Sequence, residues 1–169
     1  MERQVTEMGG NPVTLVGPEL KVGDKAPDFT VLDNGLEPKS LKDFQGKIKI
    51  VSVVPSLDTK VCDMQTRRFN EIAAGFSDEI VVLTISMDLP FAQERWCGAA
   101  GVDRVVTLSD HRDASFGENY GLLIKELRLL NRAVLIINAE DVVRYIQVVE
   151  ENHDLPDYDS ALEALKEIQ

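Results

Sequence analysis

Two cysteines are the residues of this chain best suited to chemistry. Cys62 follows the apolar run 48–54 and the segment PSLDTKV at 55–61, which places it at the expected start of a helix. The first turn of a helix presents free backbone N–H groups and the positive end of the helix dipole, so it favours the thiolate form of a cysteine. Cys97 lies in the segment RWCG at 95–98, too far away for a Cys-x-x-Cys pair. The chain therefore carries two well-separated thiols, one of them placed for nucleophilic attack.

Composition limits the partners that such a protein could have. The 169 residues contain 29 acidic and 18 basic side chains, for a formal net charge of -11, and 44% are hydrophobic. A surface of this charge repels phosphate backbones and anionic lipids, so we expect no nucleic acid and no membrane as partner. Residues 1–8 lack the apolar core of a signal peptide, and no run approaches the roughly 20 apolar residues of a membrane span. These features favour a soluble, cytoplasmic protein.

The two thiols have three possible roles in a reducing cytosol. A permanent disulfide is not expected there, so the cysteines are inert, metal-binding or redox-active. The two histidines, His111 and His153, lie far from each other and from the cysteines in the sequence, without the short ligand pairs of zinc sites. We therefore expect no metal and assign no chemistry to either histidine.

The pattern of the first half of the chain predicts an N-terminal hairpin, an irregular segment, and then a strand followed by a helix. Segments 4–8 and 12–16 flank Gly9-Gly10-Asn11 and predict a hairpin at about 3–17. An irregular crossing at 19–28, an extended piece at 29–32 and a turn at 33–35 follow. The β-branched run 48–54 predicts a central buried strand. A helix should begin at Thr59, with its apolar face on Val61, Phe69, Ile72, Ala73 and Phe76, and with Cys62 about one residue off that face.

The second half continues the alternation of strands and helices. We expect a buried strand at 80–86 and then a short helix, capped by Asp88 before Pro90 and stopped by Gly98 and Gly101 just past Cys97. A strand at 105–108, a helical turn at 114–120, a hairpin of 132–138 with 142–149 and a final helix at 158–168 complete the chain. This order predicts an α/β, thioredoxin-like fold with one central mixed β-sheet flanked by helices, formed by residues 1–169 as a single domain.

The pattern Pro55-x-x-x-Thr59-x-x-Cys62 resembles the active-site motif of the peroxiredoxins. The segments SLDT at 56–59, MDLPFAQ at 87–93, CG at 97–98 and RAV at 132–134 further resemble the thiol peroxidase subfamily, of the atypical two-cysteine type. One departure is the segment KELRLL at 125–130, where the family often has a glycine-rich and alanine-rich approach to the arginine. It leaves the shape of that loop open.

Each residue of this motif also has a physical reason to take part in peroxide cleavage. The Cys62 thiolate would attack one oxygen of the O–O bond, and the leaving oxygen gathers negative charge. The hydroxyl of Thr59 lies three residues earlier and can hydrogen-bond the peroxide or the sulfur. The guanidinium of Arg132 can stabilise both the thiolate and the developing charge on oxygen. Pro55 lacks an N–H group and can shield the thiolate from water.

Attack leaves Cys62 as a sulfenic acid, which condenses with a nearby thiol. Cys97 is the other cysteine of the chain, so we expect it to resolve the sulfenic acid as an intrachain disulfide with Cys62. Disulfides need Cα atoms about 4.4–6.8 Å apart, whereas the two cysteines belong to different predicted helices. We therefore predict that a helix end unwinds during turnover, more readily the short helix at 89–97. The resemblance further implies an antioxidant peroxidase for hydrogen peroxide and organic hydroperoxides, without a cofactor, recycled by thioredoxin and assembled as a homodimer.

Structural roles remain open for every one of these residues. A buried cysteine is often inert, Thr59 and Pro55 could serve only as a helix start and a strand end, and Arg132 could be a solvated charge. Leu89, Phe91 and Trp96 could form an apolar rim for organic hydroperoxides, a dimer face or part of the core. Two other functions also remain open: a dithiol-disulfide exchange protein, against which the missing Cys-x-x-Cys pair counts, and a non-catalytic redox sensor.

Overall fold

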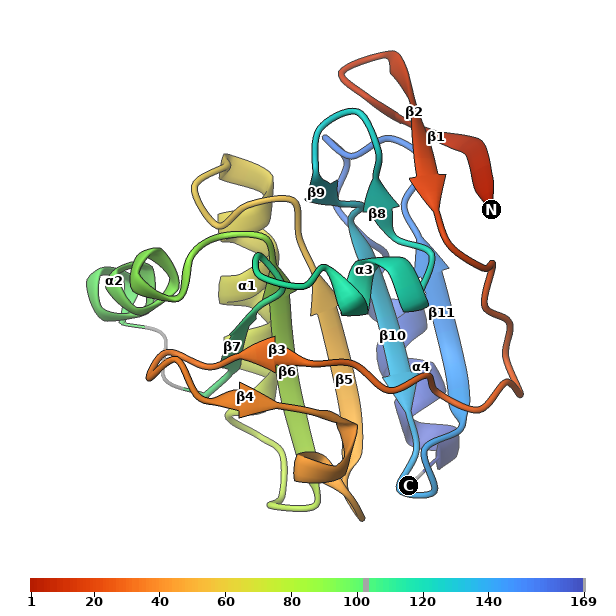
Figure 1. Cartoon of the computed structure of the whole chain (residues 1–169). Helices are drawn as coiled ribbons and strands as arrows, with labels where there is room; N and C mark the ends of the chain where they lie inside the picture. Colours follow the sequence, from red (N-terminus) through yellow and green to blue (C-terminus); the bar gives the residue numbers. More distant parts are fainter. Residues whose placement is uncertain (102–103, 169) are drawn as a thin grey trace.

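A seven-stranded mixed sheet forms the centre of the molecule (Figure 1). The computed structural model describes residues 1–101 and 104–168. In spatial order the strands are β11 (Val143–Val148), β10 (Ala133–Ile137), β5 (Ile48–Val53), β6 (Ile80–Ser86), β7 (Val106–Ser109), β3 (Val31–Leu32) and β4 (Pro38–Lys39). Strands β5, β6 and β7 run parallel, and the other neighbours pair antiparallel. The expected central strand, the α/β class and the mixed sheet are thus confirmed.

Helices cover both faces of this sheet because its central strands are apolar on both sides. Successive residues of β5, such as Ile50 and Val51, point to opposite faces of the sheet and pack into different clusters of buried side chains. The cluster that contains Ile50 is completed by α1 (Lys60–Ala73) and α4 (Tyr158–Ile168), which lie behind the sheet in Figure 1. The cluster that contains Val51 is completed by Phe116 of the short helix α3 (Ser115–Asn119) in front of it. Burying one such side chain contributes about 1.5–3 kcal/mol.

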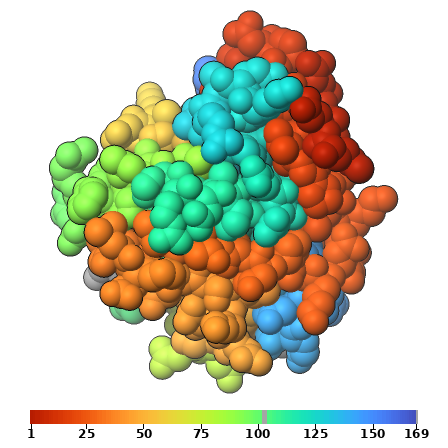
Figure 2. Space-filling model, viewed as in Figure 1, coloured from red at the N-terminus to blue at the C-terminus, as the bar shows by residue number. Residues whose placement is uncertain are grey.

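A second sheet of four strands stands beside the main one. It contains the expected N-terminal hairpin and two short strands that the sequence did not predict. It consists of β1 (Glu2–Met8), β2 (Asn11–Val16), β8 (Leu123–Ile124) and β9 (Leu129–Leu130). Strands β1 and β2 form a hairpin around Gly9 and Gly10, and β8 pairs with β2. Figure 2 shows the segment around residue 125, in cyan, packed against this hairpin, in red. The two-residue strands β8 and β9 carry no alternation long enough to be recognised in the sequence.

The buried face of α1 agrees with the expected one at Phe69, Ile72, Ala73 and Phe76, which pack into one cluster, but it differs in the first turns. The residues that point into the protein are Cys62, Gln65, Thr66 and Phe69, whereas Val61 is only half-buried. Gln65 and Thr66 can be buried because both find hydrogen-bond partners: the Gln65 amide donates to Ser52 Oγ and the Thr66 hydroxyl donates to the Cys62 carbonyl. The thiol therefore lies on the buried face of the helix, not beside it.

Helix α2 (Pro90–Ala100) also differs from its prediction at both ends. It runs through Gly98 and ends at Gly101, whose φ of 68° is the left-handed conformation that glycine adopts without strain. At its start the cap position is Leu89 and no side chain caps the helix. Asp88 turns instead toward the loop after β5, where the Ser56 hydroxyl and the Leu57 N–H donate to it, and it also accepts from Ser86 at the end of β6.

The remaining elements lie close to the residue ranges that the sequence pattern predicts. Strands β6 and β7, helix α3, the antiparallel β10–β11 hairpin and helix α4 lie where the pattern predicts them. Two short elements were not foreseen: strand β4 and the 3-10 helix η1 (Leu41–Phe44). The expected single domain also includes residues 102, 103 and 169, which lie outside the described residues. Within the described part of the chain, no helix has the length and apolar character to span a membrane.

Candidate active site

Cys62 lies in the first turn of α1, directly behind the end of the central strand β5. Thr59 is the N-cap of this helix, and its hydroxyl oxygen accepts a hydrogen bond from the Cys62 backbone N–H at 3.3 Å. The cysteine is 0% exposed and packs against Val54, Leu57 and the half-buried Trp96. A strand that ends in the core and a capped helix thus fix the position of the thiol.

The closest polar partner of the thiol is the guanidinium of Arg132. Its Nη2 lies 3.2 Å from Cys62 Sγ, although the two residues are 70 positions apart. The sheet brings them together, since β10 pairs antiparallel with β5 and places Ala133 opposite Val53. Arg132 therefore enters β10 at the same end where the chain leaves β5 toward α1. It is a buried charge, 2% exposed, and not a solvated one.

Four hydrogen bonds to three acceptors hold the buried guanidinium in place. Nη1 donates to Gln65 Oε1 at 2.9 Å, Nη2 to Cys62 Sγ, and both Nε and Nη2 to the backbone carbonyl of Asn152 at 3.0 and 2.8 Å. The Arg132 backbone N–H donates to the side chain of Asn152 at 2.7 Å. A buried charge is tolerated only when it is hydrogen-bonded in this way. The arginine is consequently fixed with one nitrogen aimed at the sulfur.

A pocket of about 270 Å³ opens beside these groups. Pro55, Thr59 and Arg132 line it, and its wall is completed by Met8, Ser56, Lys60, Val61, Leu129, Asn152 and His153. Thr59 is exposed and its hydroxyl donates to the Ser56 carbonyl at 3.1 Å. Three of the expected site residues therefore share one pocket, and Arg132 links it to the buried sulfur.

Cys97 lies in a different place, in the last turns of α2. It is half-buried and lines an open hollow of about 360 Å³ with Asn34 and Thr107. Its Sγ lies 3.8 Å from Thr107 Oγ1, which donates to Asn34 Oδ1 at 2.9 Å. Burial raises the pKa of the Cys97 thiol, and the hydrogen bond to Thr107 opposes that shift. Both cysteines are free, and the structure does not bring them into one pocket.

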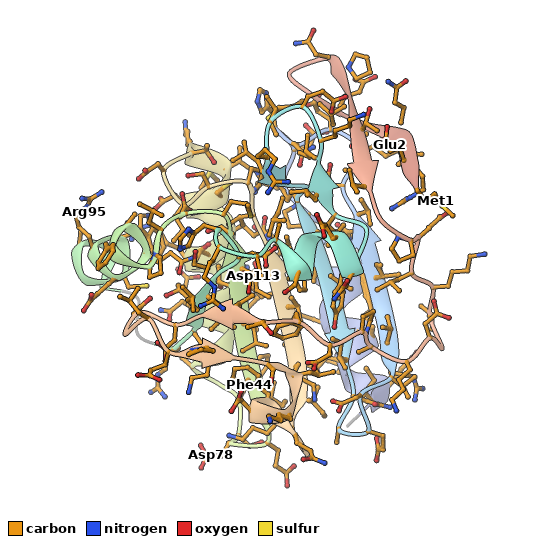
Figure 3. All side chains as sticks on the ribbon, in the orientation of Figure 1. Met1, Glu2, Phe44, Asp78, Arg95 and Asp113 are labelled. Atoms are coloured by element: carbon orange, nitrogen blue, oxygen red, sulfur yellow. The ribbon has the colours of Figure 1, made fainter. Side chains whose placement is uncertain are left out.

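The neighbours of the two cysteines nevertheless tie α1 to α2. Trp96 Nε1 donates to Asp63 Oδ1 at 3.0 Å, and Arg67 pairs with the same carboxylate at 3.0 Å. The Arg67 guanidinium also lies over the Trp96 ring, 5.6 Å from its centroid. We call Asp63, Arg67 and Trp96 the interhelix latch. Arg95, the residue before Trp96 in α2, points away from the molecule in Figure 3.

Asp88 ties the loop before α1 to the strand before α2. Its carboxylate accepts hydrogen bonds from Ser56 Oγ at 2.7 Å, the Leu57 N–H at 2.8 Å and Ser86 Oγ at 2.7 Å. The Ser86 hydroxyl in turn accepts from the Gln93 amide of α2 at 3.0 Å. One carboxylate thus supports the loop that carries Pro55 and Thr59.

Four of the residues that support the thiol were not predicted as site residues: Gln65, Asp88, Trp96 and Asn152. Gln65 had a usable signal, because it is polar and lies three residues after Cys62 on the same helix face. Asp88 was noticed but interpreted as a helix cap. Asn152 had none, since it comes from a loop 20 residues beyond Arg132.

Several other candidates have simpler positions. Leu89 and Phe91 are 51% and 63% exposed on α2, so they are not core residues. His153 is exposed at the pocket, and His111 is half-buried at the end of β7. Among residues 1–101 and 104–168, no three His, Cys, Asp or Glu side chains cluster so that they could hold a metal ion.

Comparison with known proteins places this site in a family. A family model described as Redoxin matches residues 21–162. The chain is 60% identical to a thiol peroxidase of Halalkalibacterium halodurans over 157 residues, which cover 93% of this chain and 94% of that relative. It is 60% identical to a thiol peroxidase of Bacillus subtilis over 163 residues, which cover 96% of each chain.

A solved structure agrees with these relatives. The crystal structure of a peroxiredoxin-like protein from Aquifex aeolicus superimposes with a TM-score of 0.92 at 42% identity, over 99% of both chains. The pattern Pro55-x-x-x-Thr59-x-x-Cys62, the fold and the extent of these matches agree with one another. This chain belongs to the peroxiredoxins, in the thiol peroxidase subfamily, and is an enzyme of thiol-dependent peroxide reduction.

Proposed function

We propose that Cys62 is the peroxidatic nucleophile of this thiol peroxidase. The observation that carries the proposal is the distance of 3.2 Å between Arg132 Nη2 and Cys62 Sγ in a fully buried setting. A fixed cation beside the sulfur favours its thiolate, as does the helix start. The thiolate attacks the terminal, hydrogen-bearing oxygen of a hydroperoxide ROOH, the O–O bond breaks, and RO⁻ leaves and gains a proton to become ROH. Cys62 becomes a sulfenic acid.

The pocket between Pro55 and Arg132 is where we propose that the hydroperoxide binds. Arg132 supplies one donor for the peroxide oxygens, and the Thr59 hydroxyl supplies a second when it turns away from the Ser56 carbonyl. These donors stabilise the charge that develops as the O–O bond lengthens. Met8, Val61 and Leu129 give the pocket an apolar wall that suits the organic part of an alkyl hydroperoxide as well as hydrogen peroxide. Pro55 is buried and excludes water from this side.

Cys97 is the proposed resolving residue. Its thiol loses a proton and attacks the sulfenic sulfur of Cys62, water leaves, and an intrachain disulfide forms. Because Cys62 is fully buried and Cys97 lines a separate hollow, α2 must move first, and the interhelix latch must open. The left-handed Gly101 at the end of α2 and Gly98 within it support such movement.

Recycling and assembly complete the proposal. The disulfide needs a dithiol reductant, and we propose thioredoxin, which fits a cytoplasmic setting where thiols are kept reduced. We also propose a homodimer and a single domain of residues 1–169. Support for the dimer comes from a hollow of about 280 Å³ at which the exposed apolar side chains Met64 and Leu155 meet Tyr158. Sedimentation of the reduced protein would measure its mass in solution.

Rapid mixing of reduced protein with one equivalent of hydroperoxide tests the function. The wild-type protein should lose both thiols far faster than free cysteine does. Cys62→Ser should abolish the fast reaction, whereas Cys97→Ser should keep it and stop at a sulfenic acid. A reaction of the wild-type protein at the rate of a free thiol would overturn the peroxidase and leave the redox sensor or the dithiol-disulfide exchange protein.

A further inference from the structure

Two buried asparagines form a clasp behind the guanidinium of Arg132. Asn131 and Asn152 are both 0% exposed, and Asn152 Nδ2 donates to Asn131 Oδ1 at 2.8 Å. The side-chain N–H groups of Asn131 donate to the carbonyls of Arg132 and Val149, at 3.0 and 3.1 Å. The other N–H of Asn152 Nδ2 donates to the Glu7 carbonyl at 3.0 Å. Buried amides with every group bonded specify one arrangement.

The clasp determines where the carbonyl of Asn152 points. That carbonyl accepts from both Nε and Nη2 of Arg132, and Nη2 is the nitrogen that touches Cys62 Sγ. The side-chain oxygen of Asn152 accepts from the Arg132 backbone N–H at 2.7 Å. Asn152 therefore accepts hydrogen bonds from both the backbone N–H and the guanidinium of Arg132. A shift of this loop would move the donor that faces the sulfur.

The N-terminal hairpin holds the other side of the same loop. The Glu7 carbonyl accepts from both the backbone and the side chain of Asn152, and the Glu7 N–H donates to the Glu150 carbonyl. The Glu151 carboxylate accepts from the N–H groups of Gly9 and Gly10 at 2.8 and 2.9 Å. The hairpin turn and the 150–152 segment are thus joined by hydrogen bonds to one another.

We propose that Asn152, oriented by Asn131 and by the β1–β2 hairpin, is a positioning residue for Arg132 in peroxide cleavage. Its hydrogen bonds go to Arg132, Asn131 and Glu7, and it acts on the sulfur through Arg132. It fixes the guanidinium at the distance and angle from which Nη2 meets the Cys62 thiolate. The inference rests on the proposed role of Cys62 and Arg132. The β1–β2 hairpin, which is remote from Arg132 in the sequence, thereby supports the position of the guanidinium.

The test compares Asn152→Ala and Asn131→Ala with the matched control Asn138→Ala. Asn138 is also a buried asparagine, at the far end of β10, and its side chain accepts from the N–H groups of Glu140 and Val142 in the β10–β11 turn. Its loss weakens the fold without touching Arg132. All three are made in the Cys97→Ser background, so that a single reaction at Cys62 is followed.

Two rates are measured for each variant at neutral pH: the reaction of Cys62 with hydrogen peroxide, and its alkylation by iodoacetamide. Alkylation needs a thiolate but no peroxide geometry. A displaced guanidinium should slow the peroxide reaction of Asn152→Ala by about a hundredfold, because a misplacement of about 1 Å has that effect, and Asn131→Ala should show a smaller loss. Alkylation of Cys62 in Asn152→Ala should slow less than its peroxide reaction, because alkylation does not use the donors that face the peroxide oxygens. Asn138→Ala should keep both rates.

Other titratable groups around the sulfur stay constant in this comparison. Lys60 and His153 line the pocket, Asp63 follows the cysteine, and Tyr158 lies where the charge of Arg132 acts on its hydroxyl. None of them is substituted.

The outcomes separate the inference from the proposed function. Equal rates for Asn152→Ala and Asn138→Ala, with a fast Cys97→Ser parent, would overturn the positioning role and leave the peroxidase intact. A slow parent would instead contradict the function itself. If Asn152→Ala does not fold, Asn152→Asp replaces it. This variant keeps the oxygen that accepts from the Arg132 N–H but has no donor for Asn131 and Glu7. Rates in Asn152→Asp equal to those of the Cys97→Ser parent would again overturn the inference.

Discussion

The indole N–H of Trp96 donates to the carboxylate of Asp63 at 3.0 Å, so the residue before one cysteine is bound to the residue after the other. This contact holds α1 and α2 together while both thiols are free. It also opposes the approach of Cys97 to Cys62, because the last turns of α2 cannot unwind without affecting Trp96. On the proposed resolving role of Cys97, the contact that orders the reduced enzyme must break in each catalytic cycle.

Weakening the interhelix latch should accelerate disulfide formation. Trp96→Phe removes the N–H donor but keeps an aromatic ring, and a contact of this partly exposed kind contributes about 0.5–1 kcal/mol. The rate of disulfide formation after a peroxide pulse should rise about two- to fivefold, measured by acid quench and mass analysis. Phe91→Leu, on the exposed side of the same helix, is the control and should leave the rate unchanged. A slower disulfide step in Trp96→Phe would show that the latch guides Cys97 rather than restrains it.

Asp88 should matter for stability and for the shape of the peroxide pocket. Asp88→Ala leaves the Leu57 N–H and two serine hydroxyls without their acceptor, and we expect a loss of about 2–3 kcal/mol in the free energy of unfolding. The peroxide rate should fall as well, since the loop with Pro55 and Thr59 is released. Urea denaturation and stopped-flow kinetics measure the two effects. Asp113→Ala, an exposed aspartate labelled in Figure 3, is the control; an equal effect of both substitutions would refute the role of Asp88.

The thiol of Cys97 should remain protonated at neutral pH. Burial raises its pKa, so the thiolate forms only as the pH rises above the usual range of cysteine. In the Cys62→Ser background, iodoacetamide should therefore alkylate Cys97 more slowly than free cysteine, and the rate should climb into alkaline pH. Thr107→Val removes the hydrogen bond that lowers this pKa and should shift the profile further upward. Alkylation of Cys97 at the rate of free cysteine near neutral pH would contradict this assignment.

Asp110 should make the folded protein more stable in mild acid. Its carboxyl is 1% exposed, and burial raises its pKa from 3.8 to about 6, although the N–H groups of Phe116 and Gly117 partly offset the shift. A pKa that is higher in the folded state gives a stabilising contribution below the unfolded value, which is lost as the pH rises through about 6.

The shift at Asp110 corresponds to about 3 kcal/mol between the two ends of this pH window. Urea denaturation of the wild-type protein and of Asp110→Asn, at about pH 4 and pH 7, measures it. The difference between the two proteins should change with pH by up to that amount, in favour of the wild type in acid. Because both proteins share every other carboxylate, a constant difference would exclude a raised pKa at Asp110.

The sequence predicts the main sheet well because long apolar strands carry a clear signal. Runs 48–54, 80–86 and 132–138 are too apolar to be anything but buried, and a regular alternation of strands and helices fixes their order. The second sheet could not be predicted in the same way. Strands β8 and β9 have two residues each, and they exist because the hairpin covers them.

The candidate site shows the same division between local and distant signals. Cys62, Thr59 and Pro55 lie within eight residues, so their pattern is visible in the sequence. The environment of Arg132 is not, because its partners come from α1 and from the loop after β11, and only the folded chain brings them together. Likewise, the contact of Trp96 with Asp63 depends on how α2 packs beside α1.

One measurement tests the central claim most directly: the mass of the peptides that carry Cys62 and Cys97 after reduced protein meets one equivalent of hydroperoxide. The account predicts one linked peptide pair in the wild-type protein, and in Cys97→Ser a sulfenic acid on Cys62 that a dimedone probe captures. In Arg132→Met the same products should appear at least about a hundredfold more slowly, since the cation at 3.2 Å is gone. Oxidation that begins at Cys97, or an Arg132→Met variant as fast as the wild type, would contradict it.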